Sequence, residues 1–143
     1  MITTINEFKK HIGNHDFEYQ EGPLVRKYFI VFEGIDYEIS FRKNDYNDFK
    51  GYDSVAFKVK IDGEYFYDFD KVINTNNWSR FSKLLVNVIK HDFTNNNIDG
   101  YSFSTMNNKK GNQRILLYKR LITSMGCKIL KEYDEQNKII FTL

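Results

Sequence analysis

Basic side chains gather in one short segment near the C-terminal end of the chain. They are Lys109, Lys110, Arg114, Lys119 and Arg120. The first three flank the expected start of a helix, where the backbone amides and the helix dipole also favour anions. This segment could bind a phosphate, an acidic protein surface or nucleic acid. The alternative is a solvated loop and helix face, because charged residues are mostly exposed.

Carboxylates that could act as general bases are spread over the expected strands. Glu38, Glu64 and Asp68 are candidates, but their spacing singles out none of them, and strand carboxylates are usually solvated. Aromatic residues make up 17% of the chain. They alternate as core strands do, and they do not form an exposed platform for stacking nucleic-acid bases.

Metal and thiol chemistry have little support in the sequence. His11 and His15 are four residues apart, as helical metal ligands can be, but Gly13 lies between them and no third ligand follows. We therefore expect no metal site. Cys127 begins an expected strand without an obvious histidine partner, so we interpret it as a small buried hydrophobe.

The bulk composition indicates one globular domain that spans residues 1–143. Hydrophobic residues make up 41% and charged residues 28%, and the net charge is +2. No apolar run approaches the roughly 20 residues that cross a bilayer, and the N-terminal residues lack the pattern of a secretory signal. One cysteine suits a reducing compartment. We expect a protein that is cytoplasmic in a bacterial host cell or virion-associated, with no membrane partner.

A short helix is expected at the N-terminus. Thr4 and Glu7 fit a capping box, and Ile5, Phe8 and Ile12 then share one helix face. Gly13 would end this helix, and residues 15–23 are expected to form a loop.

Four strands and then a mixed region are expected along the rest of the chain. Apolar or alternating residues predict strands over 28–32, 37–41, 55–61 and 64–69, and Asp62-Gly63 predicts a hairpin turn. Apolar spacings of three and four predict helices over 78–89 and 115–125, with 95–97 ending the first helix. A strand over 101–103 lies between the helices, and a hairpin of 129–133 with 139–141 closes the chain.

This order of elements resembles the core of the GNAT-type N-acyltransferases. The resemblance covers most of the chain from Tyr28 onward and is strongest from Ile98 to Cys127, where a strand, a basic Asn-rich loop, a helix with Leu117-Tyr118, a glycine and a strand follow one another. It implies an α+β fold with a mixed central sheet of about six to seven strands. That sheet would contain an antiparallel meander, then an α-β-α unit and a C-terminal β-hairpin.

The resemblance also implies an acyl-CoA site, from which the sequence departs. The family binds the CoA pyrophosphate with a Gln/Arg-x-x-Gly-x-Gly/Ala loop, whereas residues 72–81 contain no glycine. Asn76, Asn77 and Arg80 would be the cofactor-binding residues here.

The family's late-helix tyrosine aligns with Tyr118, which would protonate the departing thiolate or else pack in the core. The family's asparagine position holds Gly111, with Asn112 one residue later, and Gly126 lies one helical turn late.

These observations favour a non-catalytic GNAT-like module that acts through protein-protein contacts and needs no cofactor. The many Asn, Lys, Ile, Tyr and Phe residues suggest an AT-rich genome, and the Leu-Tyr-Lys-Arg-Leu helix is similar to those of phage GNAT-like proteins. Both features indicate a phage accessory or virion component. One alternative is an N-acyltransferase that uses acetyl-CoA through an atypical loop. A second alternative is anion or nucleic-acid binding through Lys109, Lys110 and Arg114.

Overall fold

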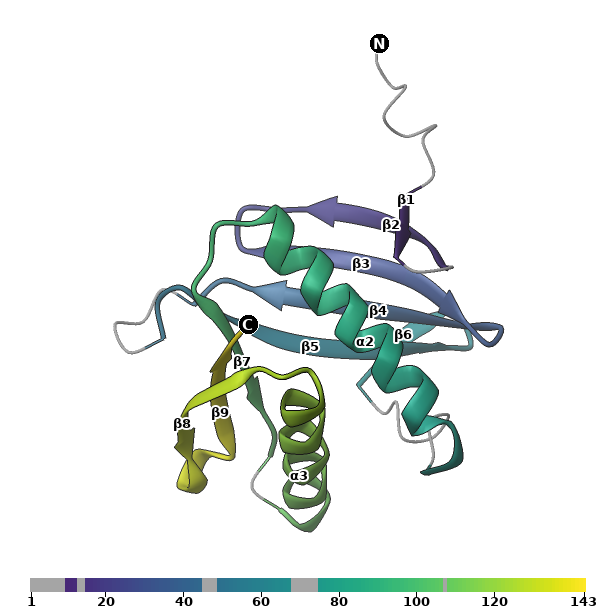
Figure 1. The fold of residues 1–143 in the computed structure, drawn as a ribbon. Helices are drawn as coiled ribbons and strands as arrows, with labels where there is room; N and C mark the ends of the chain where they lie inside the picture. Colours follow the sequence, from purple (N-terminus) through teal and green to yellow (C-terminus); the bar gives the residue numbers. More distant parts are fainter. Residues whose placement is uncertain (1–9, 13–14, 45–48, 68–74, 107) are drawn as a thin grey trace.

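The computed structural model describes residues 10–12, 15–44, 49–67, 75–106 and 108–143 of the chain. The described residues form an α+β fold with one mixed, open sheet (Figure 1). Among the described helices, none is long and apolar enough to cross a membrane.

The first six strands form an antiparallel meander. They are β1 (Lys10–Ile12), β2 (His15–Glu21), β3 (Val25–Phe32), β4 (Ile35–Arg42), β5 (Tyr52–Ile61) and β6 (Glu64–Phe66). Two of the turns are tight because their residues adopt positive φ. Glu33-Gly34 has φ values of 51° and 77°, and Asp62-Gly63 has 51° and 85°. The Asp62-Gly63 hairpin predicted from the sequence is thus confirmed.

The remaining elements alternate helix and strand. They are α2 (Thr75–Asn95), β7 (Gly100–Ser104), α3 (Lys109–Ser124), β8 (Lys128–Tyr133), the 3-10 turn η2 (Asp134–Gln136) and β9 (Lys138–Thr142). The sheet runs in the order β1-β2-β3-β4-β5-β7-β9-β8. The predicted helices over 78–89 and 115–125, the strand over 101–103 and the C-terminal hairpin are therefore confirmed, as is the end of the first helix at Asn95.

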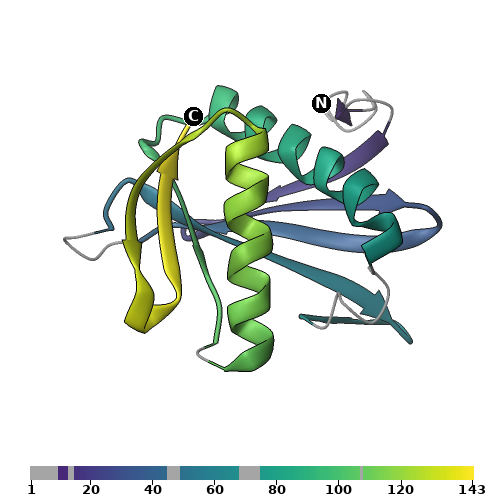
Figure 2. The same ribbon diagram turned by 60° about the horizontal axis from the view of Figure 1, so that its bottom comes forward.

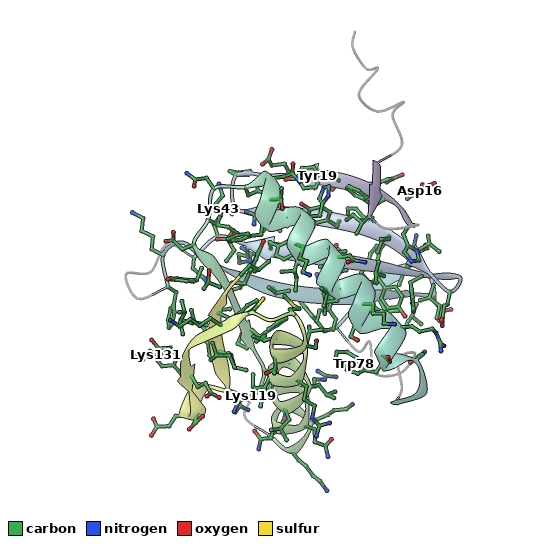
Figure 3. All side chains as sticks on the ribbon, in the orientation of Figure 1. Asp16, Tyr19, Lys43, Trp78, Lys119 and Lys131 are labelled. Atoms are coloured by element: carbon green, nitrogen blue, oxygen red, sulfur yellow. The ribbon has the colours of Figure 1, made fainter. Side chains whose placement is uncertain are left out.

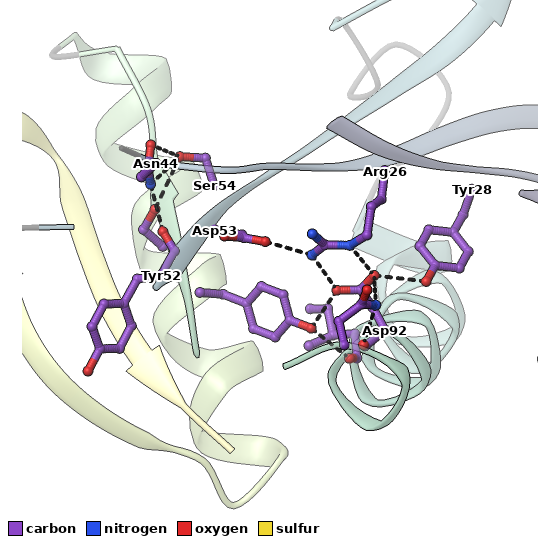
Figure 4. A network of polar contacts seen from close by, with 11 residues as sticks. Arg26, Tyr28, Asn44, Tyr52, Asp53, Ser54 and Asp92 are labelled. Carbon is purple, nitrogen blue, oxygen red and sulfur yellow. Dashed lines mark hydrogen bonds and ion pairs between the residues drawn. The ribbon is translucent and has the colours of Figure 1, made fainter. Parts of the chain in front are cut away.

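Strand β5 is the point where the two halves of the sheet meet. Its first residues pair in parallel with β7, from Tyr52 with Gly100 to Ser54 with Ser102, while its last residues pair with β6. The side chain of Ser54 lies 3.3 Å from that of Ser102, oxygen to oxygen, and accepts a hydrogen bond from Asn44 (Figure 4). The sheet therefore forks at β5, with β6 and β7 on the same edge of it.

Both helices cover the same face of the sheet (Figures 1 and 2). Phe81 of α2 and Tyr118 of α3 both contact the ring of Phe57 in β5, each at a centroid distance of 5.8 Å. Successive crossovers in one direction along the sheet produce this arrangement, because each is right-handed. The core lies between this face and the two helices.

Two expectations for the N-terminal region are wrong. Ile12, placed on a helix by its spacing, is the last residue of β1, and residues 15–21, expected to be a loop, form β2. Charged residues alternate with aromatic residues along β2, so only one face of the strand is apolar. Its pairing with β3 decides that it is a strand. The capping box of Thr4 and Glu7 lies outside the described residues.

The sheet also has more strands than the six to seven expected. It is nine-stranded in the described residues, because β1 and β2 extend the N-terminal edge. The fourth expected strand appears as β6, which ends at Phe66, and positions 68 and 69 lie outside the described residues.

Candidate functional site

A cluster of charged side chains is buried under the C-terminal half of α2. Arg26 of β3 makes two hydrogen bonds to Asp92 of α2, from Nε to Oδ1 at 2.9 Å and from Nη2 to Oδ2 at 2.8 Å (Figure 4). Asp53 of β5 lies 2.7 Å from the same Nη2 through its Oδ2. The exposed fraction is 2% for Arg26, 0% for Asp92 and 2% for Asp53. Such groups are rarely buried unless they are paired.

Further hydrogen bonds converge on Asp92. The hydroxyls of Tyr28 and Tyr101 donate to its two carboxylate oxygens at 2.8 and 2.7 Å. The side-chain amide of Asn96 donates to its Oδ1 at 3.1 Å and to its backbone carbonyl at 2.8 Å. Burial, and then the charge of Asp92, raise the pKa of both tyrosines well above the usual value.

The cluster carries a formal charge of −1, since one guanidinium faces two carboxylates. Burial raises the pKa of Asp53, and Asp92 adds to this effect, although Arg26 opposes it. Asp53 meets Arg26 as an ion pair without the alignment of a hydrogen bond. Lys43 also acts on Asp53 through its positive charge.

A pocket of about 470 Å³ opens beside this cluster. It lies between β2, β3 and the last turns of α2, and its lining residues are Phe17, Tyr19, Glu21, Tyr28, His91, Asn95 and Asn96. Figure 3 shows Tyr19 near the C-terminal end of α2. Because Tyr28 also donates to Asp92, the pocket wall and the charge cluster share a side chain.

The rings of the pocket pack around Tyr28. The centroid of the Tyr28 ring lies 5.5 Å from that of Phe17, 4.9 Å from that of Tyr19 and 6.0 Å from that of His91. Phe17 and His91 meet edge to face at 5.2 Å. Burial, and then the charge of Glu21, raise the pKa of Tyr19 to about 12. The tyrosine hydroxyls are therefore neutral at physiological pH.

Tyr118, the candidate general acid, lies inside the core. It is 6% exposed, and its ring stacks on Phe103 of β7 at 4.4 Å and meets Phe57 at 5.8 Å. The predicted position on α3 is correct, and its surroundings are those of a packed aromatic residue.

The candidate cofactor residues lie at the start of α2. Arg80 is exposed and pairs with Glu33 in the β3–β4 turn, with 2.5 Å between Nε and Oε1. Asn77 is half-buried, and the side chain of Asn76 lies outside the described part of the chain.

The residues of the basic segment lie in different surroundings. Lys109 and Lys110 are exposed in the first turn of α3, and Arg114 is half-buried. The side chain of Asn108 already caps this helix by accepting from the Gly111 amide at 2.7 Å. Lys119 pairs with Glu132 of β8, with 2.5 Å between the charged atoms.

The remaining candidates do not form a site with one another. Glu38 is 4% exposed and lies between Lys27 and Lys58 at 3.8 and 3.7 Å. Glu64 is exposed, and Asp68 lies outside the described residues. Cys127 is half-buried, and burial raises its pKa, which disfavours the thiolate. Within the described ranges, no cluster of metal-ligating side chains occurs.

Sequence reasoning missed the buried cluster, although a signal for it exists. Arg26 has the same strand phase as Tyr28 and Ile30, and Asp53 has the phase of Val55. A charged residue in the buried phase of a strand or helix needs a partner. This rule would have pointed to these positions.

Comparison with known proteins gives no relative on which to base an assignment. No family model matches the sequence, and no curated protein or solved structure is significantly similar to it. The described residues therefore define the protein only as an α+β domain with a mixed open sheet. The candidate site rests on the geometry of its own side chains.

Proposed function

We propose that the chain is a non-catalytic binding module with a GNAT-like fold, and that its binding site is the aromatic pocket between β2, β3 and α2. The order of the described elements from β3 onward, with a helix on either side of β7 and a terminal hairpin, supports the likeness to that family. The observation that carries the binding function is the 470 Å³ pocket beside a buried charge cluster. Pockets of this size that combine aromatic side chains with placed polar groups are typical ligand sites.

The surroundings of Tyr118 argue against acyl transfer. The family's asparagine position holds Gly111, where a Cβ atom would lie 1.7 Å from the Met106 carbonyl oxygen, so no side chain fits without a backbone shift. Asn112, one residue later, accepts a hydrogen bond from the Asn137 amide at 2.7 Å and so ties α3 to the β8–β9 hairpin. The side-chain oxygen of Asn112 therefore makes a structural hydrogen bond.

The start of α2 argues against a CoA pyrophosphate site. Residues 72–81 include no glycine, so side chains would crowd a phosphate that approached the backbone. Arg80, the cation expected to meet the pyrophosphate, already pairs with Glu33. These features support a module that has retained the family's order of elements without its cofactor chemistry.

A calorimetric titration with CoA and acetyl-CoA tests this proposal. We expect no heat of binding at millimolar concentration and no shift of the melting temperature, because a ligand stabilises only a native state that it binds. Micromolar CoA binding that weakens in Arg80→Ala, but not in the control Lys83→Ala on the same helix, would instead establish the acyltransferase alternative.

A further inference from the structure

We propose that the aromatic pocket binds an organic ammonium group, such as the head of a choline-like or other alkylated amine. This inference deepens the proposed function, because it names the ligand class of the same site. It depends on the ring geometry of the pocket, on which hydrogen-bonding groups remain unused, and on the charge beneath it.

The walls of the pocket present aromatic rings from two layers of the fold. Phe17, Tyr19 and Tyr28 come from neighbouring strands, and His91 comes from the helix above them. All four rings lie within 6.0 Å of a ring neighbour, centroid to centroid. Aromatic faces attract ammonium groups, and the attraction strengthens where water is excluded.

The polar groups of the pocket are left mainly as acceptors. The side-chain amide nitrogen of Asn95 donates to the His91 carbonyl at 2.7 Å, and that of Asn96 donates to Asp92. Their amide oxygens therefore remain to accept. The Tyr28 hydroxyl also donates its hydrogen to Asp92, and the carboxylate of Glu21 accepts a hydrogen bond from the Tyr19 hydroxyl. A cation in the pocket would therefore find several acceptor oxygens.

The charges around the pocket also favour a cation. The Arg26, Asp53 and Asp92 cluster beneath it is formally negative. The pocket also lies at the C-terminal end of α2, where the helix dipole is negative and no basic residue occupies the last turn. No lysine or arginine is among the lining residues. These features favour a cation over an anion in the pocket.

The volume of the pocket sets the size of the ligand. At about 470 Å³, it falls within the range of small-molecule sites. It is larger than a single ammonium head needs, so the bound amine carries further atoms, which the acceptors of Asn95 and Asn96 can orient.

The test compares choline with 3,3-dimethylbutan-1-ol, its neutral carbon isostere, in NMR titrations of the full chain at pH 8. We expect choline to shift the side-chain amides of Asn95 and Asn96 and to bind about tenfold more tightly than the isostere.

Matched variants locate the effect. Tyr19→Leu should weaken choline binding about tenfold while Tyr19→Phe, which keeps the ring, should not. Glu21→Gln should weaken choline binding. Glu18→Gln should not, because Glu18 lies three positions earlier, exposed on the opposite face of β2.

The outcomes separate this inference from the proposed function. Equal binding of choline and its isostere, lost in Tyr19→Leu, would overturn the ammonium assignment and retain the pocket as a binding site. Absence of binding by both probes at high millimolar concentration would overturn the ammonium assignment as well. Failure of the non-catalytic proposal would appear separately, as CoA binding that depends on Arg80.

Discussion

The two ends of the helix-covered face are built in contrasting ways. Where β2 and β3 meet α2, the interior holds Arg26 and Asp92 and opens into a pocket of about 470 Å³. Where β7 and β9 meet α3, the interior holds the stacked rings of Tyr118, Phe103 and Phe141, and a hollow that described residues of α3, β8 and β9 line has about 20 Å³. A space of 20 Å³ holds about one water molecule.

This difference concerns what each interior contributes to stability. Close-packed rings stabilise a domain without further requirement, whereas a buried ion pair seldom adds stability compared with apolar residues of similar size. We propose that the end with the three buried charges is the one that binds a ligand. The candidate catalytic residue, Tyr118, lies at the end without such a feature.

The largest expected effect comes from breaking the charge cluster. Arg26→Met leaves Asp53 and Asp92 buried without their cation, so we expect a loss of about 3–5 kcal/mol in the free energy of unfolding. Urea unfolding followed by circular dichroism measures it. A loss below about 1 kcal/mol would mean that the cluster is solvated rather than buried, since exposed pairs contribute at most that amount.

Asp53→Asn is the matched control for that variant. Because burial already raises the pKa of Asp53, and because Arg26 still pairs with Asp92, we expect a change of less than about 1 kcal/mol.

Alkaline pH should act next most strongly, through the buried tyrosines. Burial raises the pKa of Tyr37 and of Tyr19 from 10.0 to about 12, and it raises those of Tyr28 and Tyr101 as well. The unfolded chain ionises first, so this stability is present below pH 10 and is lost as the pH rises through the folded-state values.

From Tyr37 alone, we expect the free energy of unfolding to fall by about 2 kcal/mol between pH 10 and pH 12, and Tyr28 and Tyr101 should add to this loss. Urea titrations at several pH values, with tyrosinate absorbance at each, measure it. Ionisation of all tyrosines at pH 10 without loss of structure would contradict the burial of Tyr28 and Tyr101.

Truncation of the aromatic stack should have a somewhat smaller effect. Tyr118→Leu removes ring contacts with Phe103 and Phe57, and each such pair contributes about 0.5–1.5 kcal/mol beyond its buried area, so we expect a loss of about 2 kcal/mol. The same variant should leave choline binding unchanged. A change in ligand binding without a change in stability would show that α3 carries a site after all.

The smallest effect is expected at the Arg80–Glu33 pair. Both side chains are exposed, at 60% and 40%, so Glu33→Gln should leave the free energy of unfolding nearly unchanged. Thermal unfolding at low and high salt measures it, and the difference from the native chain should shrink as salt is added. A loss of several kcal/mol, unaffected by salt, would contradict the exposed geometry.

Much of the fold could be predicted because it depends on local pattern. The alternation of β4 and β5, the turn at Asp62-Gly63 and the helical spacing of α2 and α3 were read correctly from the sequence. Strand β2 could not, because its polar residues outnumber its apolar ones and its pairing with β3 decides its structure. The candidate site was missed because the cofactor and catalytic residues proposed from the sequence were chosen by resemblance to a family. Those residues lie elsewhere in the fold.

The sequence by itself determined the periodicity of β4, β5, α2 and α3 and the place of Tyr118 on the apolar face of its helix. Only the tertiary structure decided that Arg26 meets Asp92, which is 66 positions away, and that Asp53 joins them. Local periodicity states which face of an element is buried, but not which element will cover it. The parallel pairing of β5 with β7, and the passage of α2 over β3, bring these charges together and leave the pocket beside them.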